Sequence, residues 1–231
     1  MRKLKSLLAS IITVTLILVM PAFATSADTY SLPYVIFASG TDESVQLNSI
    51  GITVNGQIFS NGSVDVDGTW VNINGQILAQ HGSNTQEMLY LYDDLYDTFY
   101  PADSFSIRMP NSVTSTATNI NYNYNVLVNG SANLTGNINL NQSFIAKDDI
   151  VFNGDVTNKN NCILGSENGD ITISNNNVNI NCFIYAPNGT VTINGDYVNI
   201  NGIIMAERVI INSTYLNLNY SQSVEDYVNG N

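Results

Sequence analysis

The feature that most constrains the fold is a repeat of about twenty residues in the C-terminal half of the chain. Gly169 is followed by Gly189 at this spacing, and the apolar residues of one row recur in the next. The matching residues are Ile171, Ile173, Val178 and Ile180 in the first row and Val191, Ile193, Val198 and Ile200 in the second. Within each row apolar residues alternate with Asn and Thr, which is the pattern of a β-strand with one buried face.

Further rows extend the repeat. After a loss of two residues, Ile203 to Leu218 keeps the pattern, and upstream "SVDVDGTWVNINGQI" repeats it. A period near twenty with alternation inside each row is typical of a solenoid, in which neighbouring coils stack about 4.8 Å apart. No coil buries its apolar face alone, so the stack is the folding unit. The sequence therefore predicts an all-β protein, a single-stranded parallel β-solenoid of about eight coils over residues 28–231.

Asparagine fills about one position in seven, and part of it follows the repeat. Four asparagines are spaced by twenty: Asn141, Asn161, Asn181 and Asn201. In stacked coils such residues form a column in which each side-chain amide bonds the next, an arrangement that stabilises cross-β stacks. We predict a structural ladder from these four residues.

The two cysteines share this spacing. Cys162 and Cys182 are twenty residues apart, so they hold the same place in neighbouring coils, with Cα atoms about 4.8 Å apart. A disulfide accepts this distance, and export permits oxidation. A stacked pair of reduced, apolar cysteines is the alternative, and the sequence leaves both open.

One stretch, at about 84–118, interrupts the rows. It contains apolar residues at helical spacing after Asn84, which is a suitable N-cap. We predict a helix from Thr85 to Phe99 that is looped out of the solenoid and packed on its flank, followed by a return linker to about Thr118.

The first residues, "MRKLKSLLASIITVTLILVMPAFATSA", have the three parts of a secretory signal peptide: basic residues, an apolar run and small residues. We place cleavage after Ala24, with Ala27 as the alternative, so that residues 1–24 form the leader. A retained anchor fits less well, because the run is shorter than the roughly 20 residues that a membrane span needs. The mature chain is predicted to be extracellular and associated with the cell surface, with no membrane segment.

Charge limits the partners. Charged residues make up 11% of the chain, and the net charge is −12. Binding to a phosphate backbone needs clustered Lys and Arg, so this composition argues against nucleic acid. The predicted partners are further copies of the chain or other cell-surface polymers.

Both ends of the stack are predicted to be protected, since unpaired strand edges invite association. The apolar segment Tyr34 to Phe37 is expected to cap or dock at the N-terminal end. The tail after Leu218, with Glu225 and Asp226, is expected to cover the last coil. This arrangement favours a monomer or a short assembly over an indefinite filament.

The rows "VNINGQI" and "VNINGII", with the leader and the opening "YVIFASG", resemble secreted right-handed β-helix proteins of clostridia-like Gram-positive bacteria. Over most of Tyr34 to Leu218 the repeat rhythm is also similar to that of bactofilin-type polymer-forming proteins. Bactofilins are cytoplasmic, so the leader departs from their pattern. The resemblance rests on rhythm, and no functional residue is carried over from it.

The sequence contains no recognisable catalytic, cofactor-binding or metal-binding motif. Asp65 and Asp67 point to one face of a strand, and Asp149 and Asp170 occupy matching places in adjacent rows, so calcium between stacked carboxylates is one interpretation. We favour carboxylates that are solvated or that bond backbone amides. His81 is the single histidine and is interpreted as a surface-loop residue.

Aromatic residues leave a further choice. Trp70 and the thirteen tyrosines would serve as a carbohydrate-stacking platform if they shared one face, but we interpret them as packing or corner residues. We predict a secreted, non-enzymatic structural or adhesive cell-surface protein without a cofactor. The alternative is a pectate-lyase-like carbohydrate-active enzyme or a carbohydrate-binding protein. An acid pair and a basic residue in one groove would favour the enzyme. A smooth surface of Asn and Thr side chains would favour the structural role.

Overall fold

The computed structural model describes residues 34–79 and 107–228, which form seventeen strands and one helix. The first strands are β1 (Tyr34–Ala38), β2 (Glu43–Asn55), β3 (Gln57–Ser60), β4 (Ser63–Asn74) and β5 (Ile77–Ala79). Those that follow residue 107 are β6 (Ile107–Met109), β7 (Val113–Ser115), β8 (Asn119–Tyr122), β9 (Val126–Val128), β10 (Ala132–Thr135), β11 (Asn137–Leu140), β12 (Phe144–Ala146), β13 (Ile150–Asn153), β14 (Val156–Thr157), β15 (Cys162–Ser166), β16 (Ile171–Ser174) and β17 (Asn177–Asn219). The helix is α3 (Gln222–Val228). The leader, the predicted helix Thr85–Phe99 and His81 lie outside the described residues.

The strands pair in parallel and stack into a β-solenoid of about seven turns, which confirms the predicted fold class. The twenty-residue repeat sets the register, since Ile171 lies opposite Val191 and Ile173 opposite Ile193. These side chains point into the coil and are fully buried. The polar residues between them, such as Thr172 opposite Thr192, lie on the outside.

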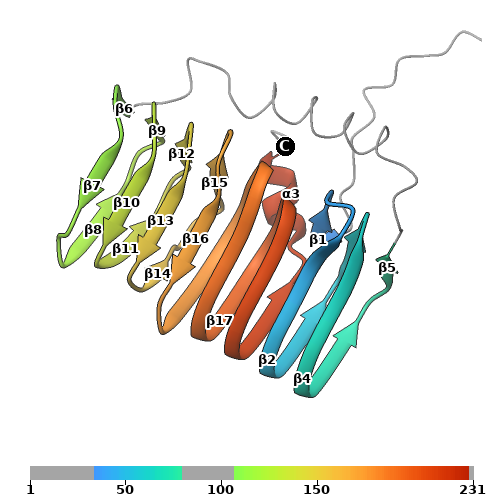
Figure 1. Cartoon of the computed structure of the whole chain (residues 1–231). Helices are drawn as coiled ribbons and strands as arrows, with labels where there is room; N and C mark the ends of the chain where they lie inside the picture. Colours follow the sequence, from blue (N-terminus) through green and yellow to red (C-terminus); the bar gives the residue numbers. More distant parts are fainter. Residues whose placement is uncertain (1–33, 80–106, 229–231) are drawn as a thin grey trace, which may run out of the picture. The chain divides into compact units, whose positions relative to one another are not determined.

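The coils do not stack in the order of the sequence. From residue 107 onward they do, because β6–β8, β9–β11, β12–β14 and the strands β15–β17 each pair with the next. β17 then pairs with β1 and β2, which pair on their other side with β3 and β4. Residues 34–79 therefore extend the stack beyond its C-terminal coil, so that β6–β8 form one end and β4 and β5 the other (Figure 1).

This order corrects three predictions. Residues 107–118 contain β6 and β7 where a return linker was expected, and the coils restart at the opposite end of the stack. Tyr34 to Phe37 does not cap an end, because β1 lies between β17 and β3. The tail after Leu218 does not cover an open edge, because β2 already pairs with that coil, Leu218 opposite Val54.

The tail instead forms α3, which packs on the outside of β15 and β17. Its residues Val224 and Val228 are buried in an apolar cluster on the outer face of these strands. Glu225 is also buried and accepts hydrogen bonds from the Tyr220 hydroxyl and the Gln222 amide. Burial, and then the hydrogen bond to Glu225, raise the pKa of the Tyr220 phenol well above its usual range. Across residues 34–79 and 107–228 no helix has the length and apolar character to cross a membrane.

The two cysteines lie in the core. Cys162 of β15 is in register with Cys182 of β17, their Cα atoms are 4.9 Å apart, and a disulfide joins them. Both side chains are fully buried. The bond links neighbouring coils covalently beneath α3 and the apolar cluster that it covers.

Candidate functional site

A row of exposed aromatic side chains runs along one flank of the stack. Tyr197 and Tyr215, both on β17, stack with ring centroids 5.3 Å apart and ring planes within 15°. The registers place Tyr215 opposite Gly51 of β2, and Gly51 opposite Trp70 of β4. Tyr197, Tyr215 and Trp70 are 57%, 50% and 74% exposed. The row therefore crosses four coils and presents three aromatic rings to solvent.

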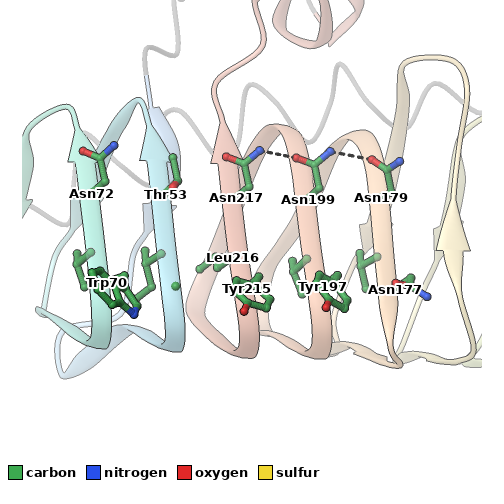
Figure 2. A pocket seen from close by; sticks show the side chains of 15 residues that line it. Thr53, Trp70, Asn72, Asn177, Asn179, Tyr197, Asn199, Tyr215, Leu216 and Asn217 are labelled. Atoms are coloured by element: carbon green, nitrogen blue, oxygen red, sulfur yellow. Dashed lines mark hydrogen bonds between the residues drawn. The ribbon is translucent and has the colours of Figure 1, made fainter.

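A second row, of polar side chains, lies beside the aromatic one. It contains Asn199, Asn217, Thr53 and Asn72, each two residues after a member of the first row, and begins at Asn179 on the preceding coil (Figure 2). The Asn199 Nδ2 donates to Asn179 Oδ1 over 2.8 Å, and the Asn217 Nδ2 donates to Asn199 Oδ1 over 2.7 Å. These bonds hold the amides in a fixed orientation along the stack.

The two rows border a shallow hollow of about 780 Å³, which we call the aromatic groove. Its floor contains the buried side chains of Val178, Val198, Leu216 and Ile52. Gly51 lies in the first row between Tyr215 and Trp70, and at this position there is no side chain. A Cβ at Gly51 would lie 3.1 Å from the Tyr215 ring, which is closer than ordinary van der Waals contact. Glycine therefore leaves space for that ring.

The groove offers two kinds of contact. An exposed ring presents an apolar face, and Tyr and Trp also carry a polar hydrogen-bonding group. An Asn amide has two N–H donors and an oxygen with two lone pairs. One donor and one lone pair of Asn199 are used within the row, so one of each remains for a ligand. Rings stand on three of the four coils of the row, with a gap at Gly51, and neighbouring coils are about 4.8 Å apart.

The predicted asparagine ladder is present in part. Asn201 donates to Asn181 over 2.9 Å, as expected. Asn161 does not join it, because its amide donates to the Ser223 carbonyl of α3, and Asn141 donates to Asn123. Beyond Asn201 the column continues through residues that the twenty-residue spacing does not reach: Asn219, Asn55 and Asn74.

The candidate acids do not lie at the aromatic groove. The Asp149 carboxylate accepts a bond from the Asp170 amide nitrogen, and the Asp170 carboxylate accepts one from Thr190. Asp65 and Asp67 are exposed on β4. In the part of the chain that the structure describes, no three His, Cys, Asp or Glu residues gather as a metal ion would need.

A second hollow, of about 700 Å³, collects charged residues where the turn between β1 and β2 meets β17. Asp42, Glu43 and Glu207 line it together with Arg208. The Arg208 Nε atom is buried, and within the described residues it has no hydrogen-bond partner. Acids and a positively charged side chain thus share one hollow, and none of its lining residues belongs to the aromatic groove.

Sequence reasoning identified Trp70 but interpreted it as a packing or corner residue; a side chain that is 74% exposed is not a packing residue. The sequence alone could have placed Tyr197 opposite Tyr215, because the row Ile203 to Leu218 is offset by two residues from the interval of twenty. The position of Trp70 was not, because it depends on the stacking of residues 34–74 beyond the C-terminal coil.

Comparisons with known protein families, with curated proteins and with solved structures find no match to this chain.

Proposed function

We propose that this protein is a secreted, non-catalytic adhesive solenoid of the cell surface, and that its aromatic groove binds an extended carbohydrate chain. The observation that carries the proposal is the pair of parallel rows, with Trp70, Tyr197 and Tyr215 in one and the amides of Asn199 and Asn217 in the other. The ligand class follows from the chemistry of these rows.

A sugar ring has an apolar face of C–H groups and a rim of hydroxyl groups. Exposed aromatic rings complement the face, and amides with a spare donor and acceptor complement the rim. A repeat of about 4.8 Å along the stack is close to the length of one sugar unit in an extended chain. The groove is open along the stack, so it suits a polymer that lies across several coils.

The composition of the groove supports binding over catalysis. Its lining consists of Asn, Thr, Gly, aliphatic and aromatic residues. Glycoside hydrolysis needs a pair of carboxylic acids that flank the bond to be broken. The side chains of the groove hold and orient a ligand, which is the role of an adhesin.

The test compares the purified protein with Trp70→Ala and Tyr215→Ala variants in binding to insoluble polysaccharides and to a glycan array. Each side chain is exposed, so its removal should leave the fold intact. We expect each variant to bind about tenfold more weakly, which corresponds to roughly 1.4 kcal/mol.

Tyr124→Ala is the matched control, because Tyr124 is 61% exposed and does not line the groove. It should bind as the wild type does. Equal affinity of the wild type and Trp70→Ala for every glycan that is bound would contradict the proposal, and so would a lack of binding to all of them.

The charged hollow favours a second candidate function, cleavage of an acidic or neutral polysaccharide. Its carboxylic acids, Asp42, Glu43 and Glu207, are the residue type that such enzymes use as acid and base, and Arg208 adds a fixed positive charge beside them. Incubation with the polysaccharides bound above, with assay of reducing ends and unsaturated products, separates the two functions. Product that disappears in Glu207→Gln would establish the enzyme, and intact polymer would leave adhesion as the function.

A further inference from the structure

We propose that this protein associates head to tail with further copies of itself, coil β6–β8 of one copy stacking on β4 of the next. This inference is independent of what the aromatic groove binds. It starts from the apolar residues at the two ends of the stack. Inward-facing residues of the middle coils are buried, whereas Val64, Val66 and Ile73 at one end are only partly buried. At the other end Met109, Val113 and Tyr122 are also only partly buried.

The two ends are matching cross-sections of one coil. Ile120 of β8 is in register with Ile138, and through Val156 with Val178. At the other end Leu216, Ile52 and Val71 continue the same position. A second copy would therefore place Ile120 on Val71 and Val113 on Val64, which repeats the pairing found inside the stack.

The asparagine column gives the two ends opposite polarity. Asn74 donates to Asn55, Asn55 to Asn219, and Asn219 to Asn201, so every amide donates in the same direction. At the far end Asn141 donates to Asn123 in that direction too. Among the described residues the Asn74 Oδ1 and the Asn123 Nδ2 have no partner, so the β4 end presents an acceptor and the β8 end a donor.

This polarity selects head-to-tail association. Two β4 ends would bring acceptor against acceptor, and two β8 ends donor against donor, whereas unlike ends complete the column. An interface between unlike surfaces does not close on itself as a two-fold dimer does, and it continues to further copies. Exposed parallel strand edges supply backbone donors and acceptors for the same union.

One strand must give way. β5 pairs with β3 through Ile77 opposite Ile58, and the registers assign β6 the same place in the coil. β5 has three residues, all exposed. An incoming β6 would replace it, while β7 and β8 add pairing along β4 that β5 does not provide. The exchange gains strand pairing, which favours displacement of β5.

The test uses two variants. Each keeps the hydrogen bond inside its own column and exchanges donor for acceptor, or acceptor for donor, at one end of the stack. Asn74→Lys still donates to Asn55 but turns the acceptor end into a cationic donor. Asn123→Asp still accepts from Asn141 but turns the donor end into an anionic acceptor. Sedimentation velocity and light scattering of the purified protein over a wide concentration range should show chains of increasing length for the wild type. Each variant alone should associate about tenfold more weakly.

The double variant Asn74→Lys/Asn123→Asp should regain association, because Lys at one end meets Asp at the other, and high salt should weaken it. Circular dichroism verifies that each variant is folded. A wild type that stays monomeric at every concentration would overturn the proposal. So would variants that associate as the wild type does, or a double variant that is weaker than both single ones.

Discussion

Strands β2 and β4 are neighbours that pair residue by residue, from Val45 opposite Val64 to Val54 opposite Ile73. Both alternate apolar and polar residues. In β2 the apolar residues Leu47, Ile52 and Val54 are buried, whereas in β4 every residue is at least partly exposed. The difference is that β2 has a coil on each side and β4 has one. Burial in this fold therefore depends on the position of a coil in the stack as much as on its sequence.

The largest expected effect separates Ile52 from Val71, which hold the same position in these two strands. Ile52→Asp places a carboxylate where 1% of the side chain is exposed, and it should destabilise the fold by more than about 4 kcal/mol or prevent folding. Val71→Asp, at 46% exposure, should cost within about 1 kcal/mol. Urea denaturation at a protein concentration low enough to keep the chain monomeric measures both, and equal losses would contradict this account of burial.

A smaller effect should separate Asn201 from Asn74 within one column. The Asn201 side chain donates to Asn181 and accepts from Asn219, whereas among the described residues the Asn74 side chain makes one bond, to Asn55. Asn201→Ala should cost about 2 kcal/mol, because both neighbours lose a partner, and Asn74→Ala about 0.5 kcal/mol. The free energy of unfolding of the two variants gives the comparison, and a larger loss at Asn74 would contradict this account of the column.

The smallest effect is a pH dependence at the corner where β2 ends. The Tyr220 amide nitrogen donates to the Asn55 carbonyl there, and the raised pKa of its phenol means that the folded state favours the neutral form. That stabilisation is complete below the unfolded pKa of about 10 and is lost as the pH rises above it. Stability should therefore fall less between neutral and strongly alkaline pH in Tyr220→Phe than in the wild type. Tyr124→Phe is the control, and it should follow the wild type.

Sequence spacing predicted the parts of the fold in which stacked residues are close in the chain. The pairing of Ile171 with Val191 and of Cys162 with Cys182 followed from a constant interval of twenty residues. The pairing of Val45 with Val209 did not, because nothing in the local pattern indicates which coil becomes the neighbour of an apolar row. The aromatic groove was missed for the same reason, since Trp70 reaches it through that long-range pairing.

The amide column shows a related limit. A strict interval of twenty led to Asn161, whose amide bonds α3, and missed Asn219, which lies eighteen residues after Asn201. Coil length varies by a residue or two at the corners, where the chain can lose residues without changing the strands. Columns are therefore defined by strand register, and sequence interval follows them only where the corners are equal in length.

The pairing of β2 with β17 also bears on the order in which the coils fold. Asn48 and its partner Asn212 are 164 residues apart, so the first two coils emerge during synthesis long before the strand on which they rest. Contacts between distant residues form slowly, because a long loop must close first. The coils from residue 107 to 219 have their neighbours close in sequence, so we expect them to fold first and residues 34–79 to dock last. A nascent chain that is cut short before Val209 loses its last coil and, with it, the platform that its opening coils require.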